Sequence, residues 1–418
     1  MRNKTALAAA AAAGVMAMAA GGQAMAQDNT TAWKGAPQWS NDDVTFKVRG
    51  RILVDAVFQD VDRDVGTDVN VRSIRGRQVF LGVEGQLNSR ITYKIEGGWV
   101  NNGSPAWDDV VIEYKPSEFS SIAFGNIKTY GLENITSTRF RSFMDQGAVG
   151  EITEANYHLG IVGKVWGPNW TAALAVQGNS INSSDVTLSS NTSTSNAEER
   201  IQYVGRVTFA PILTDTDKLH LGLWIRQRDS ASDGAFTYET RANTNIAPRF
   251  TSTGAIGDSD TTWGAEFAYI HNSFSLQAEY ASVDVTVRPA LAPATAQNGT
   301  IPVGYIYATW WPTGEMRNYD PTKGEFGRPK IQAPINAGGM GGVELTARYD
   351  WTDLTDIRGT VTPPNFAGEF SAYTLGVNYY PTSYVRFMMN YTRAEHDNLN
   401  ASFNSTEQLF QARAQLDF

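Results

Sequence analysis

Three cations lie on one side of the first predicted strand, residues 44–58. Lys47, Arg49 and Arg51 share one parity, whereas the apolar residues from Val44 to Phe58 hold the other. Successive side chains of a strand point to opposite faces, so the cations form a row roughly 6.6–6.8 Å apart. Such a row can attract an anion electrostatically but cannot catalyse a covalent reaction. It could be a ladder of binding positions along which an anion moves through a pore. The alternative is three ordinary solvated charges.

The environment of the apolar face decides where these cations point. On a lipid face one cation costs roughly 2–4 kcal/mol at the midplane, and three would cost about 6–12 kcal/mol. If the strand crosses a membrane, the cations must therefore face a water-filled interior. The same parity argument places further cations there: Lys94, Lys164, Arg206, Arg226, Arg228, Arg348, Arg386 and Arg413.

Carboxylates share this predicted interior. The acids on lumenal positions are Asp55, Glu84, Glu96, Glu266, Glu279, Glu344 and Asp350. The whole chain has a formal net charge of −9, although its first strand is basic, so charge is patterned along the sequence. Low-dielectric walls focus the field at a constriction, and net charge therefore does not determine ion selectivity.

The strands that must position these groups are numerous and short. Period-2 alternation predicts sixteen strands, at 44–58, 73–87, 90–100, 107–115, 120–128, 155–166, 169–178, 200–210, 218–229, 259–270, 273–285, 303–311, 342–352, 370–380, 383–394 and 407–418. Tight turns alternate with long polar loops such as 59–72, 179–199, 230–258, 286–302 and 395–406, the asymmetry of outer-membrane barrels. Segment 312–341 is long but falls on the turn side. It is either a folded periplasmic segment or a missed hairpin.

The two ends of the chain support export to an outer membrane. Residues 1–26 combine a basic start, an alanine-rich apolar run and the small-x-small site Ala24, Met25 and Ala26, which predicts a signal peptide cleaved after Ala26. Residues 27–43 are polar and are expected to be irregular and periplasmic. The last strand alternates up to the terminal Phe418, and aromatic residues such as Trp263 and Tyr373 flank the apolar rows as membrane girdles do. The fold class is therefore an all-β transmembrane antiparallel barrel over residues 44–418.

One segment has a more specific pattern. Residues 124–139, FGNIKTYGLENITSTR, resemble the phosphate-selective porin O and P family, in which F-G-x-x-K leads into G-L-E-x-x-T-S-S-[KR] at the start of an inward-folded third loop. The matching segments are 47–51 (KVRGR), 314–320 (GEMRNYD), 373–380 (YTLGVNYY) and 388–393 (MMNYTR). The resemblance extends over about residues 44–418. It implies a sixteen-stranded trimeric porin whose third loop folds into the lumen and whose channel cations bind anions.

The resemblance also assigns roles to individual residues. Arg51 falls on the family's strand-1 arginine, Arg139 on the last basic position of the loop motif, and Asp108 on the acid of an F-D-E motif. Family members that select phosphate carry lysines where this chain has Asn134 and, nearby, Thr92. Lys128, Arg139 and Arg141 lie within or beside the loop and could partly compensate.

The sequence thus predicts a passive outer-membrane pore for small anions, phosphate or polyphosphate being the class that the resemblance suggests. The expected channel-lining residues are Lys47, Arg49, Arg51, Lys94, Asp108, Lys128, Arg139, Arg141, Arg206, Arg226 and Arg228. The alternatives are a general porin, and a barrel whose loops 230–258 and 286–302 act as an adhesin. The four histidines show no metal spacing and no nucleophile elbow appears, so we expect neither an enzyme nor a cofactor. The expected partners are small anions, outer-membrane lipid and two further copies of the chain, but no nucleic acid.

Overall fold

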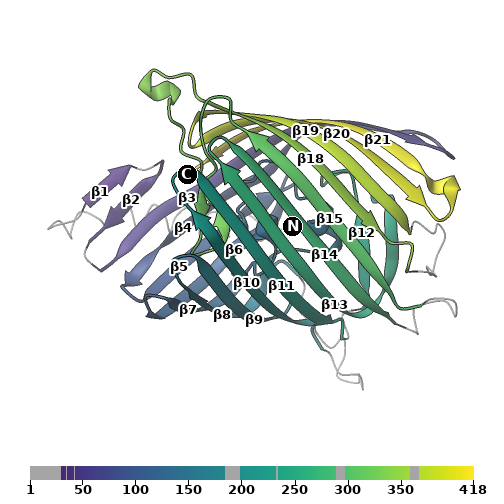
Figure 1. The fold of residues 1–418 in the computed structure, drawn as a ribbon, viewed down its shortest axis with the longest axis horizontal. Helices are drawn as coiled ribbons and strands as arrows, with labels where there is room; N and C mark the ends of the chain where they lie inside the picture. The colour runs from purple at the N-terminus through teal and green to yellow at the C-terminus, as the bar shows by residue number, and fades with distance from the viewer. Residues whose placement is uncertain are drawn as a thin grey trace, which may run out of the picture.

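Sixteen antiparallel strands close into a barrel (Figure 1). The computed structural model describes residues 30–33, 35–41, 43–183, 198–231, 234–288, 297–357 and 367–418. The first half of the wall consists of β3 (Thr45–Arg63), β4 (Val69–Asn88), β5 (Ile91–Val100), β6 (Ser104–Ser117), β7 (Ser120–Ile127), β8 (His158–Trp166), β9 (Trp170–Gln177) and β10 (Ile201–Leu213). The second half consists of β11 (Asp217–Asp229), β13 (Thr251–His271), β14 (Phe274–Val287), β15 (Gly299–Trp310), β18 (Gly342–Asp353), β19 (Gly368–Thr382), β20 (Val385–Asn398) and β21 (Ser405–Asp417).

The last strand closes the barrel against the first. β21 pairs with β3 from Ser405 opposite Arg63 to Asp417 opposite Arg51. Because every wall strand then has two neighbours, the closed sheet leaves no unpaired strand edge in the membrane. All sixteen predicted strands are confirmed, and most are longer than the sequence indicated.

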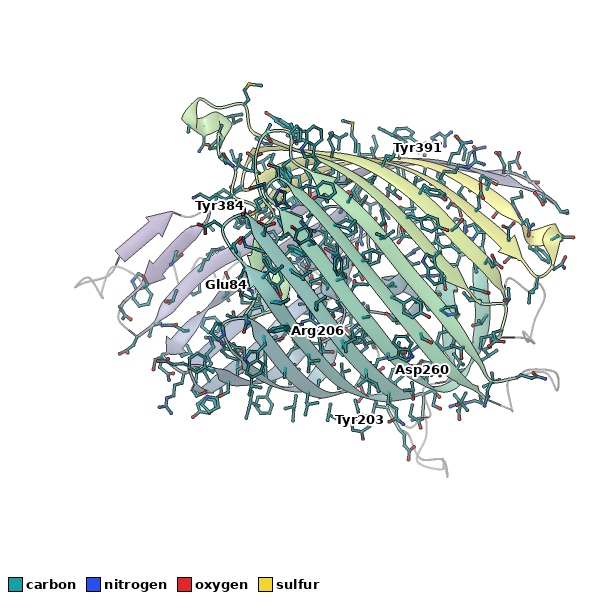
Figure 2. The ribbon with its side chains drawn as sticks, viewed as in Figure 1. Glu84, Tyr203, Arg206, Asp260, Tyr384 and Tyr391 are labelled. Atoms are coloured by element: carbon teal, nitrogen blue, oxygen red, sulfur yellow. The ribbon has the colours of Figure 1, made fainter. Side chains whose placement is uncertain are left out.

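The side chains of the wall alternate between two faces. Those on the outer face are apolar and exposed, and those on the lumenal face are polar and buried. On β11, Leu223 is 59% exposed and Ile225 is 54% exposed, whereas their neighbours Arg226 and His220 are buried. Tyr203 and Tyr391 project outward from opposite sides of the barrel in Figure 2. This inside-out arrangement suits a wall between lipid and water, as the parity argument predicted.

The segment before the barrel is not irregular, contrary to the prediction for residues 27–43. β1 (Thr30–Trp33) and β2 (Pro37–Ser40) form a hairpin, and β2 pairs with the first residues of β3. The Asn41 side chain accepts a hydrogen bond from the backbone N–H of Val44 at 2.7 Å, which shapes the turn between β2 and β3. This local turn chemistry lets the strand pattern begin earlier than hydrophobic alternation shows.

Several connections differ from their predicted lengths. Because β3 and β4 are both extended, the loop predicted at 59–72 shrinks to 64–68. The loop predicted at 395–406 shrinks to 399–404 and contains the 3₁₀ turn η3 (Ala401–Phe403). Polar residues occupy both faces of a strand once it rises above the membrane, so alternation fades before the ladder ends. Parts of the loops predicted at 179–199 and 286–302 lie outside the described residues.

The predicted loop 230–258 folds into the barrel mouth. It contains β12 (Phe236–Thr240), which pairs with the start of β13. Phe236 and Tyr238 are buried, and the Tyr238 hydroxyl donates to Asp260 at 2.8 Å. The sequence predicted a long polar loop here, whereas two of its aromatic residues are buried inside the barrel. This also weakens the adhesin alternative.

Segment 312–341 is a folded insertion at the turn end and not a missed wall hairpin. It contains the short pair β16 (Tyr319–Asp320) and β17 (Glu325–Phe326), followed by η2 (Ile335–Ala337). Phe326 packs with Leu132 in one apolar cluster, and the amide group of Phe326 donates to the Thr136 hydroxyl at 3.3 Å. The insertion therefore reaches inward and supports residues 128–157.

Candidate functional site

The connection between β7 and β8, residues 128–157, turns into the barrel. It is the third connection at the loop end, after 64–68 and 101–103, and holds α2 (Leu132–Ile135) and α3 (Ala148–Ile152). Tyr130, Phe143 and Ile152 are each at most 1% exposed, so the segment is packed inside the wall. The predicted inward-folded third loop is confirmed, and we call residues 128–157 the inward loop.

A wall carboxylate holds the start of α2. The backbone N–H groups of Leu132 and Glu133 donate to the Glu279 side chain on β14, the second at 3.0 Å. Gly131 precedes them at a φ of +78°, a left-handed conformation that favours glycine. The free N–H groups of a helix start attract an anion, so Glu279 is well placed to fix the loop.

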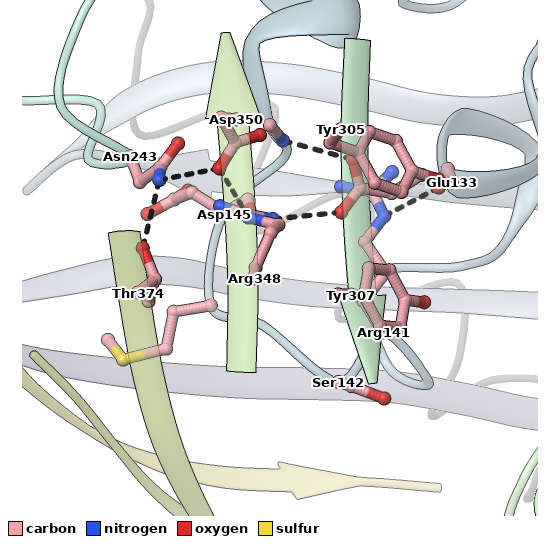
Figure 3. Close-up of polar contacts among 12 residues, drawn as sticks. Glu133, Arg141, Ser142, Asp145, Asn243, Tyr305, Tyr307, Arg348, Asp350 and Thr374 are labelled. Carbon is pink, nitrogen blue, oxygen red and sulfur yellow. Dashed lines mark hydrogen bonds and ion pairs between the residues drawn. The ribbon is translucent and has the colours of Figure 1, made fainter. Parts of the chain in front are cut away.

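A second wall carboxylate holds the start of α3 (Figure 3). Asp350 on β18 accepts from the backbone N–H of Ala148 at 3.2 Å. Arg348 on the same strand pairs with Asp350 at 2.7 Å and with Glu133 of the loop at 3.1 Å. Gly147 lies so close that an added Cβ would be 2.0 Å from Asp350 Oδ1. The inward loop is thus fixed by charge-assisted contacts at both helices.

The inward loop also seals one side of the lumen with apolar contacts. Val149 and Ile152 belong to the same buried cluster as Val283, Val303 and Tyr305 on the lumenal faces of β14 and β15. Apolar packing excludes water from this side. The aqueous passage must therefore run along the opposite wall.

Two cavities lie along that opposite wall. The loop-side cavity, about 450 Å³, is bordered by charged residues that include Arg77, Arg141 and Arg241. The turn-side cavity, about 480 Å³, is bordered by β4–β10 and by Lys323 of the turn-end insertion. Among the described residues, Lys128 alone borders both cavities. Lys128 therefore marks the junction of the passage.

Lys128 carries its charge without a carboxylate partner in the described structure. Its Nζ donates to the carbonyl oxygen of Asn134 at 3.1 Å and lies 4.6 Å from the centre of the Tyr157 ring. Arg141 Nη2 donates to the same Asn134 oxygen at 3.2 Å, and Arg141 likewise forms no ion pair with the described residues. Burial, and next the Arg141 guanidinium, lower the pKa of Lys128 to about 7. An anion at this point would meet two uncompensated cations.

The three cations of β3 face the lumen, and each has an acidic neighbour. Lys47 lies 3.6 Å from Glu84, while Arg49 contacts Glu84 and lies 2.6 Å from Glu96. Arg51 is 3.1 Å from Glu96. The sequence left open a ladder for anions or three solvated charges, and in the structure each of the three cations has a carboxylate beside it.

Glu96 also binds the inward loop to the wall. Arg139 donates to both oxygens of Glu96 at 2.8 and 2.9 Å, and Arg51 contacts Asp108. Lys94 pairs with Asp109 at 3.1 Å. Glu96 thus lies between three arginines, two from β3 and one from the inward loop.

The remaining predicted cations are dispersed around the wall. Arg206 makes a two-point contact with Glu266 at 2.8 and 2.6 Å. Arg226 and Arg228 share Asp260 at 3.0 and 2.5 Å. Arg226 also contacts the inward loop through the Tyr130 hydroxyl at 2.8 Å. These three arginines anchor structure and do not meet Lys128 at one point.

The comparisons with known proteins match this architecture. The sequence model described as "Phosphate-selective porin O and P" matches residues 46–418. The chain belongs to this family. It is 27% identical over 403 residues to an uncharacterized protein of Caulobacter vibrioides, covering 92% of this chain and 76% of that one. It is 25% identical over 391 residues to Porin O of Pseudomonas aeruginosa, covering 85% and 84%.

Solved structures share the fold of this porin. OmpT, an outer membrane protein of Vibrio cholerae, superposes with a TM-score of 0.54 at 11% identity, covering 91% of this chain and 99% of that one. An anion-selective porin from Comamonas acidovorans gives 0.51 at 12% identity, with coverage of 89% and 100%. The protein is therefore an outer-membrane porin, and the predicted family, fold and location are confirmed.

The structure places the two neutral positions of this porin near the passage. Asn134 contributes its carbonyl oxygen to Lys128 and Arg141, while its amide nitrogen donates to the Tyr130 carbonyl at 3.0 Å. Thr92 donates to Glu113 at 3.0 Å in the turn-side cavity. Neither position adds a cation, so Lys128 and Arg141 are the loop residues that could replace the missing charge.

Sequence reasoning missed the basic residues at the mouth of the pore. Arg77, Arg241 and Arg249 border the loop-side cavity, where Arg241 and Arg249 lie 3.1 and 3.0 Å from Glu151. Arg77 has the parity of the outward-facing Val79 and Leu81, and it turns inward only because the pairing of β4 with β3 shifts at this residue, so alternation gave no signal for it. The two loop arginines gave none either, because nothing in a polar loop sequence shows that it folds inward.

Proposed function

We propose that this porin passes small anions in preference to cations, and that Lys128 with Arg141 forms the selective point. The observation that carries the proposal is the position of Lys128 between the two cavities, next to a second cation and with no carboxylate in contact among the described residues. A focused positive field at the narrowest point attracts anions whatever the net charge of the chain.

The mechanism needs no covalent step. An anion entering the loop-side cavity would exchange part of its hydration for the Lys128 ammonium and Arg141 guanidinium groups, then leave through the turn-side cavity. The contacts must be weak enough to release the anion. Phosphate or polyphosphate is the first candidate class, supported by the family's description as phosphate-selective and by the fold shared with the anion-selective Comamonas porin.

The other predicted site residues serve this proposal in a secondary way. Lys47, Arg49, Arg51, Lys94, Arg139 and Arg206 hold partners, so they raise the lumenal potential less than free cations would. Asp108 moderates the field of Arg51. Arg226 and Arg228 position the inward loop. Selectivity thus rests on few residues.

Planar-bilayer recordings test the proposal. In a KCl gradient, the reversal potential should have the sign of chloride preference, and millimolar phosphate should reduce the chloride current. A reversal potential of the opposite sign would reject anion selectivity. Absence of a phosphate block would support the alternative of a general porin with little selectivity, which the neutral Asn134 favours.

We further propose the processing and assembly of the chain. Residues 1–26 are a signal peptide cleaved after Ala26, residues 27–43 precede the barrel on the periplasmic side, and three copies assemble. The alanine-rich start supports the cleavage, and the trimer form of Vibrio cholerae OmpT supports the assembly. N-terminal sequencing and the mass of the unheated protein in detergent would check them.

A further inference from the structure

The turn-side cavity contains two opposite charges that have no ionic partner among the described residues. Glu113 on β6 and Lys164 on β8 both border it. Their neighbours on the other parity, Ile112 at 61% exposure and Val165 at 44%, face outward, so the two charged side chains face the lumen. They lie on the open wall of the passage.

Neither group is compensated by the described protein. Glu113 accepts only the Thr92 hydroxyl at 3.0 Å, and Lys164 has its ammonium group 5.7 Å from the Trp166 ring. By contrast, the other charged residues of this cavity have partners within ion-pair distance, with Lys128 as the exception: they are Glu84, Lys94, Asp109, Arg206, Lys323 and Glu325. Within the described part of the chain, the cavity therefore keeps one free carboxylate and two free ammonium groups.

The strand register sets the spacing of Glu113 and Lys164. Glu113 lies opposite Ala123 of β7, and Ala123 lies opposite Val162 of β8, two residues before Lys164. Two strand spacings amount to roughly 10 Å between the backbones. Both side chains are long enough to narrow that gap. The side chains between them, Ala123 and Ser121, are small and leave room for a solute.

We propose that the turn-side cavity holds a subsite for a small amphoteric anion, a solute with one ammonium group and acidic groups, as in an acidic amino acid. Its ammonium group would face Glu113, and its carboxylates would face Lys164 and Lys128. The proposal rests on the proposed anion preference, which would bring such a solute into the pore. Complementary charges in a confined site favour the matching solute over one that leaves Glu113 unpaired. Binding must remain weak for the solute to pass.

A matched pair of probes tests this subsite: glutamate and glutarate, which differ by the α-ammonium group. Both are added on the turn side of single channels in a planar bilayer at pH 7, and the block of chloride current is titrated. Glutarate carries the larger negative charge, so a simple cationic pore would favour it. We expect glutamate to block at about five-fold lower concentration, the size of one partly solvated ion pair.

Substitutions assign the effect to the two residues. Glu113→Gln should remove the advantage of glutamate over glutarate while the channel still conducts chloride. Lys164→Gln should weaken the block by both probes. Lys218→Gln, at the turn end and outside both cavities, is the matched control and should leave both titrations unchanged. Conduction by each variant shows that the barrel has folded.

Two results would overturn the subsite: glutarate blocking the wild type as well as or better than glutamate, or a glutamate advantage that survives Glu113→Gln. These outcomes are separable from failure of the proposed function. A cation-selective reversal potential in KCl rejects anion preference, whereas an anion-selective potential with no glutamate advantage rejects the subsite alone.

Discussion

Lys128 and Arg141 donate to the same acceptor, the carbonyl oxygen of Asn134, at 3.1 and 3.2 Å. One neutral oxygen therefore holds two cations side by side at the junction of the two cavities. Like charges at this separation repel, and a buried ammonium group loses hydration. An anion that reaches this point would reduce both the repulsion between the two cations and the cost of the lost hydration. The pair is thus maintained by the fold of the inward loop and not by its own attraction.

Removal of the Lys128 charge should reduce anion selectivity. We expect Lys128→Gln to lower the chloride-to-potassium permeability ratio about three- to ten-fold, the effect of one unit charge a few ångströms from the ion path at intermediate dielectric. Reversal potentials in a KCl gradient measure the ratio. Lys218→Gln removes a lysine of the turn end and should leave the ratio unchanged. Equal ratios for Lys128→Gln and the wild type would place the selective point elsewhere.

The selectivity should also depend on pH near neutrality. Lys128 has a pKa lowered to about 7, chiefly by burial, so it is charged below pH 7 and neutral above. The chloride preference should therefore be higher at pH 6 than at pH 8.5. Arginine stays protonated over this range, so Lys128→Arg should remove the step. A step that persists in Lys128→Arg would point to another titratable group bordering the passage.

Glu96 should oppose anion passage while stabilising the barrel. It lies 2.6, 3.1 and 2.8 Å from Arg49, Arg51 and Arg139, and all four side chains are buried. Glu96→Gln leaves three guanidinium groups without their shared carboxylate. We expect a loss of about 3–5 kcal/mol in unfolding free energy, the cost of breaking a buried ion pair, together with a higher chloride preference.

Urea unfolding of the detergent-solubilised barrel and reversal potentials would measure the two effects of Glu96→Gln. Glu395→Gln is a suitable control, because Glu395 pairs with Arg393 at 3.1 Å and both side chains are about half exposed. A surface pair of this kind contributes at most about 1 kcal/mol. If both variants behaved alike, the network around Glu96 would contribute little to the fold.

Alternation was sufficient to predict the wall and the direction of most side chains in it, but not of those beyond the pairing shift in β4. The apolar rows of β11 and β21 and the cations between them could be assigned to lipid and lumen because a membrane wall tolerates few exceptions. The parity of a residue does not, however, show which residues lie beside it on the neighbouring strands. Arg51 could be placed inside, but its contacts with Glu96 and Asp108 depend on the register of neighbouring strands. For this reason the sequence could not show whether the β3 cations are free or paired.

Segments that fold inward without alternation were harder to predict. The inward loop was found only through its resemblance to a family motif. Phe236 and Tyr238 of β12, and Phe326 of the turn-end insertion, are buried aromatic residues in segments that composition marks as polar loops. Their packing partners lie on strands distant in the sequence, so no local sequence pattern predicts that these aromatic residues are buried. Consequently the arginines at the loop-side mouth, including Arg241 and Arg249, were missed.

Gly147 should be essential for the position of the inward loop. A Cβ at this residue would lie 2.0 Å from Asp350 Oδ1, the atom that accepts from the Ala148 amide group. Gly147→Ala must therefore displace α3 or break this contact, at a cost of about 1–3 kcal/mol for overpacking. Because the loop borders the passage, single-channel conductance should change as well.

Gly163→Ala is the matched control for Gly147→Ala: Gly163 has no atom within 4 Å of the added Cβ and lies on the outward face. Gel mobility of unheated and heated samples gives the unfolding temperature, and bilayer recordings give the conductance. Wild-type values for Gly147→Ala in both measurements would show that Asp350 does not fix the loop.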